Sequence, residues 1–343
     1  MSKITSSLKQ TIQLIVDILS FENSDSDLKQ HLDTTDWDQL VTVASQHLVL
    51  PAVYCRLEQK SLLGLLPDDL VLYLEELTKL NRDRNQTLLC EIQQISQLFQ
   101  LNNIQHVIIK GSALLAGNYY KDMGERMIGD IDILVASNDL DKAFNLLVRK
   151  GYNQFLSFNY KVKNYRHRPR QISDTHLGAV ELHDQLLKHD FNHLIDKDAF
   201  LSNVEIVNDV IIPNSEYLIW NTVLAHQIND RCYYYNRLNL RAVYDTFVLG
   251  LPINKKLIEE LFRQKYGLAY LNLVSVFCPS IWPSLQSLPS SFKKQTYQLS
   301  LGFPIYGKLL LKCKLSYIVI NERINLLIFN KSYRSHVFKN KLN

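Results

Sequence analysis

The segment that most constrains the fold of this chain is a short strand pattern that carries two acids. Residues 130–135 read Asp-Ile-Asp-Ile-Leu-Val. Because side chains alternate across a β-strand, Asp130 and Asp132 project from one face, and Ile131 and Ile133 project from the other. Two carboxylates side by side on an apolar strand repel each other and resist burial. A divalent cation removes that penalty, and Mg²⁺ is typically bound by one or two carboxylates together with substrate phosphates. The pattern therefore predicts a metal site on a buried strand.

A second apolar run, at residues 106–109, precedes this strand and also reads as a buried strand. Lys110, Gly111 and Ser112 follow it and lead into a helical pattern. We expect Gly111 to let the backbone turn tightly and approach a ligand, and Ser112 to cap the helix and offer its hydroxyl to a phosphate. Since the amides at a helix N-terminus form an anion site, a phosphate cradle would lie beside the carboxylate pair. This combination favours metal-assisted phosphoryl or nucleotidyl transfer.

These residues resemble the Gly-Ser and Asp-x-Asp signature of the polymerase-β-type nucleotidyltransferases. The chain is more similar still to a bacterial group called uncharacterised nucleotidyltransferases, through Lys110-Gly111, the tyrosines at 119–120 and Arg126. The similarity runs from the helices before the motif to about residue 250. One departure is the interval of 18 positions from Ser112 to Asp130, which is longer than in minimal members of the superfamily.

The resemblance implies an α+β fold, in which a small mixed β-sheet of the polymerase-β type lies between two helical domains. We divide the chain into an N-terminal helical domain at 1–103, a catalytic core at 104–213 and a C-terminal helical domain at 214–343. It also implies a third carboxylate on a later strand. In the pattern Val-Glu-Leu-His, alternation places Glu181 and His183 on one face, so Glu181 is the candidate. An exposed acid on an edge strand is the alternative reading of Glu181.

The implied reaction moves a nucleoside monophosphate from an NTP, with ATP or CTP expected, to an acceptor hydroxyl, and releases pyrophosphate. Asp130 and Asp132 would hold two Mg²⁺ ions, with Mn²⁺ as a substitute, and Glu181 would share the ion that activates the acceptor. Ser112 and the amides from Gly111 onward would bind the β- and γ-phosphates. Lys110 or Arg126 would neutralise the leaving pyrophosphate. The acceptor can be a small molecule, a peptide or protein, or RNA, because a fold does not define a substrate.

Two basic segments are candidate contacts for an anionic substrate or a nucleic acid. Residues 161–170 lie between the acidic strands and include Arg166 and Arg168, so this loop would hold a triphosphate or a polyanionic acceptor. A solvated hairpin tip is the alternative. The C-terminal segment at 308–341 would form a helix with an apolar core face and a basic solvated face, or a basic helix that docks RNA.

Two histidines complete the set of candidate substrate contacts. His183 is either a structural histidine or a contact to the substrate. His226 would reach the nucleotide base or the acceptor, although we favour a buried pair between His226 and Asp245 that joins two helices.

Helical patterns flank the motif on the N-terminal side, and a hairpin follows it. A long helix begins at Pro67, and its polar stretch Asn81–Asn85 reads as a break with a solvated face. Residues 204–213 read as a short strand or a pair of strands, with Asn208-Asp209 as a turn, and would complete the sheet of the core.

Composition narrows the class of protein. The net charge of +4 is too small to indicate nucleic-acid binding by itself. The five cysteines are odd in number and far apart, which argues against a disulfide framework or a zinc site. The N-terminus reads as an amphipathic helix and no apolar run is long enough to span a membrane, so we expect a cytoplasmic protein. The family resemblance implies that it is bacterial.

Two other functions use the same residues. A Mg²⁺-dependent phosphohydrolase would also need Asp130 and Asp132, but the chain shows no nucleophile elbow, and Gly-Ser before a helix favours NTP binding. A degenerate nucleotide-binding module would act on a partner through its helical domains. Such a module would be expected to have lost a carboxylate, whereas all three candidates are present.

Overall fold

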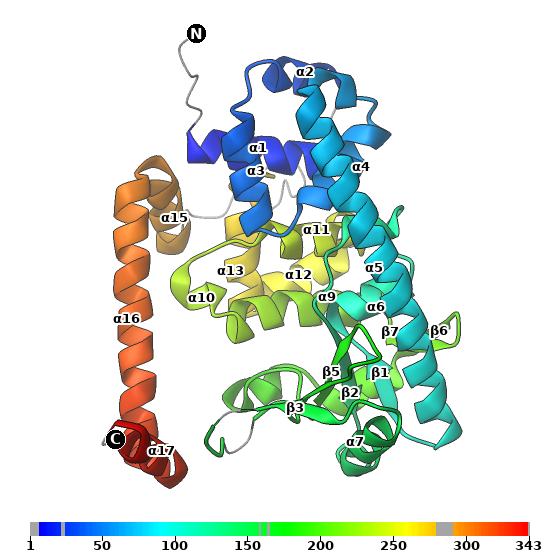
Figure 1. The fold of residues 1–343 in the computed structure, drawn as a ribbon. Coiled ribbons are helices and arrows are strands. Elements are labelled where there is room, and N and C mark those ends of the chain that lie inside the picture. The colour runs from blue at the N-terminus through cyan, green and yellow to red at the C-terminus, as the bar shows by residue number, and fades with distance from the viewer. Residues whose placement is uncertain (1–6, 22–24, 158, 163–164, 279–290, 342–343) are drawn as a thin grey trace.

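The computed structural model describes residues 7–21, 25–157, 159–162, 165–278 and 291–341. It combines many helices with one small mixed sheet, as predicted for the fold class. Helices from the N-terminal part lie at one end of the molecule and the sheet lies at the other (Figure 1). The division into three domains stays a prediction.

The N-terminal part consists of four short helices and one long one. Asp36 begins the third helix by accepting a hydrogen bond from the Gln39 amide, and Pro51 lies in the first turn of the fourth, where each residue type is favoured. The five helices are α1 (Leu8–Leu19), α2 (Asp25–Leu32), α3 (Trp37–Gln46), α4 (Leu50–Gln59) and α5 (Asp68–Leu101).

Helix α5 is continuous through its polar stretch, so the predicted break with a solvated face is wrong. The amide nitrogen of Asn81 donates to the carbonyl oxygens of Gly124 and Arg126, at 2.7 and 3.1 Å. Asn85 is fully buried and donates to the carbonyls of Met123 and Arg126, at 2.6 and 2.8 Å. These two side chains are buried because they satisfy the backbone of the loop that leads into the acidic strand.

The same helix also supports the later acidic strand. The Glu91 carboxylate is buried and accepts hydrogen bonds from the amides of Leu177 and Gly178, at 2.6 and 2.8 Å. These amides immediately precede the strand that carries Glu181. Helix α5 therefore holds both segments that lead into the acidic strands, and it runs along the side of the sheet (Figure 1).

The sheet has five strands in the order β1-β2-β5-β4-β3. Strands β2 and β5 are parallel, and the other pairs are antiparallel. Helix α6 (Lys110–Ala116) follows β1, and helix α7 (Leu140–Arg149) follows β2 and ends before Gly151, whose φ is +106°. The strands are β1 (His106–Ile108), β2 (Asp130–Val135), β3 (Gln154–Leu156), β4 (Arg170–Ile172) and β5 (Ala179–His183).

The predicted hairpin at 204–213 forms, but it does not join this sheet. Strands β6 (Val204–Val207) and β7 (Val210–Pro213) pair only with each other, around Asn208 and Asp209, whose φ angles of 49° and 65° are typical of a tight hairpin turn. The amide of Ile211 donates to the Ser96 hydroxyl of α5 rather than to β1. The main sheet therefore ends at His183, and the prediction that it extends to residue 213 is wrong.

The rest of the chain is helical. Helix α9 continues into a π-helical turn, Ala225–Asn229, which widens the helix beside the sheet. The helices are α8 (Lys197–Ser202), α9 (Ser215–Leu224), α10 (Cys232–Tyr235), α11 (Leu240–Val248), α12 (Lys255–Arg263), α13 (Lys265–Val274), α15 (Phe292–Gly302), α16 (Pro304–Phe329) and α17 (Lys331–Lys341).

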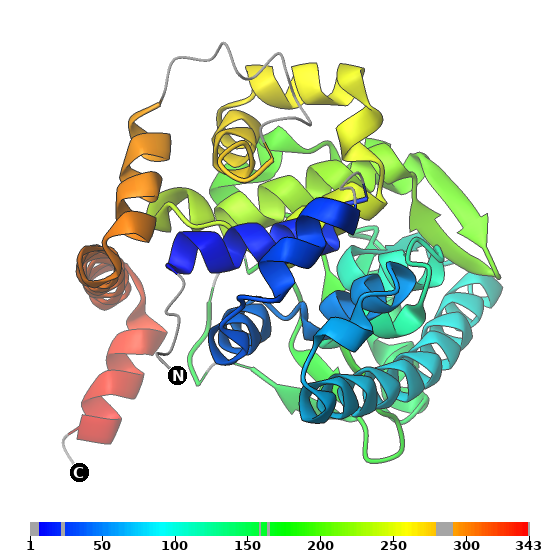
Figure 2. The same ribbon diagram turned by 90° about the horizontal axis from the view of Figure 1, so that it is seen from above.

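Helix α16 stands at the rim of the molecule, where Figure 2 shows it end-on. None of its side chains is buried, and Ile305 and Phe329 are 86% and 82% exposed. The predicted core face is therefore wrong, because its apolar residues are distributed around the helix instead of gathering on one side. Contacts to the body include an ion pair between Glu322 and Arg231. Among the described helices, none is both long and apolar enough to cross a membrane.

Candidate active site

The parallel pairing of β2 and β5 brings the three predicted carboxylates together. Asp132 lies directly opposite Glu181 in the register, and both are buried. Ligand atoms of Asp132, Glu181 and His183 all lie within 4.8 Å of one another. Asp130 belongs to the same group, since one nitrogen of Arg170, Nη2, lies 2.5 Å from Asp130 Oδ2 and 2.8 Å from Glu181 Oε1.

Hydrogen bonds and nearby cationic side chains around the cluster stabilise the ionised forms of two of the three carboxylates. Burial favours the neutral form of Asp132, but Lys110 Nζ at 2.5 Å and His183 Nε2 at 2.7 Å outweigh it and hold the pKa of Asp132 well below its usual range. For Glu181, burial is likewise overcome by His183, His167 and Arg170, and the pKa falls to about 2. Both groups are therefore anionic at neutral pH.

Asp130 is left with excess negative charge. Burial raises its pKa, and the neighbouring carboxylates of Asp132 and Glu181 raise it further, against Lys110 and Arg170. A raised pKa means that the ionised form of Asp130 is disfavoured. A cation bound nearby would stabilise that ionised form. The donor set fits a divalent cation: carboxylate oxygens suit Mg²⁺ and Mn²⁺, and His183 adds a nitrogen that suits transition metals such as Mn²⁺.

Ser112 does not occupy the predicted place. Helix α6 begins at Lys110, its cap position is Ile109, and no side chain caps it. Ser112 lies inside the helix, fully buried, and its hydroxyl donates to the carbonyl oxygen of Asp130 at 2.9 Å. The predicted cap is therefore wrong. The Ser112 hydroxyl instead links α6 to β2 through this hydrogen bond.

The tight turn also differs from its prediction. The left-handed conformation falls on Lys110, with φ 56°, rather than on Gly111. A Cβ atom at Gly111 would lie 3.2 Å from Nη2 of Arg126, so the glycine leaves room for that guanidinium. Gly111 therefore leaves space for the Arg126 side chain, while its backbone angles could be adopted by any residue.

Replacing Ser112 with alanine should cost stability. The variant leaves the buried Asp130 carbonyl without this donor, so we expect a loss of about 1–3 kcal/mol in the free energy of unfolding. Urea denaturation of wild type and Ser112→Ala measures it, with Ser202→Ala, an exposed serine on α8, as the control. If Ser112→Ala keeps wild-type stability but binds NTP more weakly, the Ser112 hydroxyl contacts the phosphates as first predicted.

Arg126 is held by a helix that is far away in sequence. Its Nε and Nη2 donate to the two carboxylate oxygens of Asp245 on α11, at 2.9 and 3.0 Å, and both side chains are buried. The Tyr120 hydroxyl donates to the same carboxylate at 2.6 Å. Asp245 is thus the partner of Arg126, and the predicted pair between His226 and Asp245 is wrong. His226 is buried, and its Nδ1 lies 3.7 Å from Asp230 Oδ2.

A cleft opens beside Asp130 and Asp132. Arg166 and Arg241 line it, and neither forms an ion pair within the described part of the chain. Burial, and then the neighbouring Arg126, lower the pKa of Arg241, yet a guanidinium stays charged at any ordinary pH. The cleft is lined by Lys110, Gly111, Arg126, Ile128, Gly129, Asp130, Asp132, Arg166, Ala225, Asn229, Asp230 and Arg241.

The arginines of the basic loop at 161–170 lie in different places. Arg166 lines the cleft, and Arg170, on β4, bridges Asp130 and Glu181. Arg168 pairs with Asp141 of α7 at 2.5 Å and does not line the cleft, although it lines a second cavity of about 690 Å³. His226 is not among the residues that line the cleft.

Sequence reasoning missed Arg170 and Arg241 as site residues. Arg170 differs from its neighbours in the loop only by its position at the start of β4, two residues after Arg168. Arg241 shares a helix with Asp245, and a positive residue at a helix start carries no functional signal of its own. Only the packing of α11 against the cleft distinguishes it.

No protein with a curated description matches this chain closely enough to count as a relative. A family model described as uncharacterised nucleotidyltransferase matches residues 33–250, which extend from α3 to α11 and include the whole sheet and the cleft. The matched region is more than half of the chain. The chain therefore belongs to the uncharacterised nucleotidyltransferase family, whose members are transferases of nucleotidyl groups.

Proposed function

We propose that this protein transfers a nucleoside monophosphate from an NTP to an acceptor hydroxyl, with Mg²⁺ and with release of pyrophosphate. One observation carries the proposal. Asp130, Asp132 and Glu181 lie together beside a cleft lined by two arginines that form no ion pair with any described residue. The three carboxylates would hold the metal. When bound there, a divalent ion supplies charge neutralisation of the phosphates and activation of the acceptor hydroxyl.

The side chains have separate roles in this proposal. Arg166 and Arg241 bind the phosphates, since both line the cleft and neither forms an ion pair among the described residues. Lys110 keeps Asp132 ionised, and His183 orients the same carboxylate through its ring nitrogen. Arg126 shapes the cleft through Asp245 instead of binding pyrophosphate by itself.

Arg241→Gln should weaken NTP binding. Loss of one charge-assisted hydrogen bond is worth about 1.5–3 kcal/mol, which corresponds to a dissociation constant roughly ten- to hundredfold higher. Arg168→Gln is the matched control, because Arg168 is exposed and paired with Asp141. Titration of each variant with a non-hydrolysable NTP measures the difference, and equal affinities in both would remove Arg241 from the phosphate site.

A second cavity supports a place for the acceptor. It has a volume of about 690 Å³ and lies on the Glu181 side of the cluster, with Tyr160, Tyr165 and His167 in its lining. His167 connects the two, because its Nε2 lies 3.6 Å from Glu181 Oε2. We propose that the acceptor enters here, so that its hydroxyl meets Glu181 while the NTP lies in the cleft.

Tyr165→Ala should reduce transfer without weakening NTP binding. The Tyr165 ring packs edge-on against His167, with centroids 4.5 Å apart, so its removal opens the acceptor side and leaves the cleft intact. Transfer of label from the NTP into acceptor, compared with NTP affinity in the same preparation, separates the two effects. A parallel loss of both would place Tyr165 in the NTP site.

One experiment tests the proposed function as a whole. The purified chain is incubated with Mg²⁺, a cell extract and each NTP radiolabelled at its α-phosphate. Nucleotidyl transfer predicts that one class of molecule becomes labelled and that pyrophosphate appears in equal amount. A phosphohydrolase would release inorganic phosphate from small phosphoesters and label no acceptor, and a degenerate module would bind NTP without releasing pyrophosphate.

A further inference from the structure

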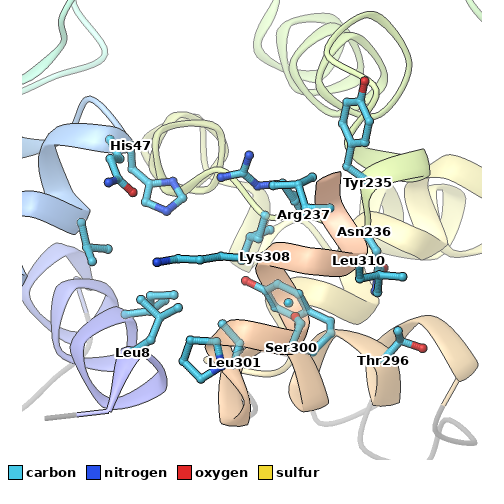
Figure 3. Close-up of a pocket in the computed structure, with 18 residues that line it drawn as sticks. Leu8, His47, Tyr235, Asn236, Arg237, Thr296, Ser300, Leu301, Lys308 and Leu310 are labelled. Atoms are coloured by element: carbon cyan, nitrogen blue, oxygen red, sulfur yellow. Dashed lines mark hydrogen bonds between the residues drawn. The ribbon is translucent and has the colours of Figure 1, made fainter. Parts of the chain in front are cut away.

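A cavity lies between the N-terminal helices and the C-terminal helices, away from the residues of the candidate active site. Its volume is about 190 Å³, and its walls come from α1, α3, α15, α16 and the link between α10 and α11 (Figure 3). Most of the wall is apolar. The apolar lining residues are Leu8, Ile12, Val43, Leu238, Leu301, Pro304, Leu310 and Leu311.

One side of this cavity is positively charged. Arg237 and Lys308 extend toward His47, the residue that follows α3, so the three side chains gather at one end (Figure 3). No carboxylate belongs to the lining, and over the described ranges neither Arg237 nor Lys308 forms an ion pair. Two cations beside an apolar wall, with no counter-ion among the described residues, form the electrostatic complement of an anion.

His47 adds a neutral donor. Its Nδ1 accepts a hydrogen bond from the Leu240 amide at 3.2 Å, which places the ring proton of the neutral form on Nε2. Burial, and then the nearby Arg237, lower the pKa of His47 to about 4, so the ring is neutral at physiological pH. The charged end of the cavity therefore offers hydrogen-bond donors that suit the oxygens of an anion.

Size limits what can bind. An apolar cavity of roughly 150 Å³ holds a benzene ring, so this one accommodates a ring or a short alkyl chain with one small charged group, and it is too small for a nucleotide. We propose that the cavity is a binding site for a small organic anion, an aromatic or short aliphatic carboxylate. The charged group lies against Arg237, Lys308 and His47, and the apolar part lies against Leu8 and Leu301.

The site is independent of the proposed transferase chemistry, since it shares no lining residue with the cleft. The cavity is nevertheless connected to the cleft through helix α11. His47 holds the amide of Leu240, the first residue of α11, and Arg241 and Asp245 follow on that helix. A ligand that contacts His47 therefore lies one hydrogen bond from the helix that supplies Arg241 to the cleft.

Fluorine NMR of the full chain tests the proposal with 4-fluorobenzoate as the probe. Wild type should bind it saturably, while 4-fluorobenzyl alcohol, which has the same ring without the charge, should bind at least tenfold more weakly. Lys308→Met and Arg237→Met should each weaken 4-fluorobenzoate binding by tenfold or more. Lys312→Met is the matched control, because Lys312 lies one turn further along α16, is exposed and does not line the cavity.

Both substituted side chains are exposed, so the variants should fold, and circular dichroism melting of each confirms it before binding is compared. The proposal is overturned if wild type shows no saturable binding, if the alcohol binds as well as the benzoate, or if both variants bind like Lys312→Met. Inorganic phosphate in place of the probe distinguishes a bare anion site: equal competition by phosphate would show that the apolar wall contributes nothing, and would also overturn the proposal.

Discussion

Asp132→Asn is expected to abolish NTP turnover and also to destabilise the protein, whereas Asp130→Asn should abolish turnover and leave stability unchanged or slightly higher. Both acids belong to the proposed metal site, and a metal ion contributes several kcal/mol to the transition state. Since each 1.4 kcal/mol is about tenfold in rate, the loss should be at least about 10³-fold in either variant.

The two variants should differ in stability because the two acids have opposite pKa shifts. The pKa of Asp132 is lowered on folding, so its ionised form stabilises the native state at neutral pH, and this contribution is lost only as the pH falls through the unfolded value and below it. Its replacement also leaves Lys110 and His183 without their carboxylate. The pKa of Asp130 is raised, so its charge opposes folding at neutral pH and asparagine removes that penalty.

Thermal melting without added metal, followed by pyrophosphate release with Mg²⁺, measures both effects on the same samples. Asp141→Asn, an exposed acid on α7, is a control for charge removal. If either variant keeps wild-type turnover, the carboxylate cluster is not the catalytic metal site. If Asp130→Asn destabilises the chain more than Asp132→Asn does, the charge balance described for the cluster is wrong.

Arg126→Met is expected to cause the largest loss of stability of any single change considered for this protein. It leaves the buried Asp245 carboxylate with only the Tyr120 hydroxyl, and breaking a buried ion pair on one side costs about 3–5 kcal/mol. The double variant Arg126→Met with Asp245→Asn should recover a large part of that loss. In the double variant no unpaired charge is buried, and the asparagine can still accept from Tyr120.

The midpoint of urea unfolding for wild type, both single variants and the double variant gives the coupling between the two residues. Additive losses in the double variant would show that the pair is not coupled. A fully stable Arg126→Met that binds NTP poorly would return Arg126 to the role implied by its family resemblance, that of a pyrophosphate ligand.

The acidic cluster could be predicted from sequence because its geometry is local. Alternation along one strand places Asp130 and Asp132 on one face, and the same rule places Glu181 and His183 together on another. Pairing of these two strands then needs only the parallel register that sets Asp132 opposite Glu181. The roles of these residues in catalysis stay predictions.

The partners of the surrounding polar residues could not be predicted, because they come from distant elements. Arg126 and Asp245 are 119 positions apart, and nothing in either segment indicates the other. Asn81 and Asn85 read as a solvated break because their partners are backbone carbonyls about forty positions later, and backbone groups leave no mark in a sequence. The Ser112 hydroxyl was misassigned for the same reason, since its acceptor is a carbonyl oxygen.

The hydrogen bonds of helix α5 limit how this protein can be dissected. A fragment that begins at residue 104 would contain the whole sheet and every acid of the cluster. It would lack Asn81 and Asn85, which satisfy the carbonyls before β2, and Glu91, which satisfies the amides before β5. Both acidic strands would enter the sheet from segments with unpaired backbone groups. Functional complementation, crystallisation or directed evolution of the transferase therefore has to keep α5 in the same polypeptide as the sheet.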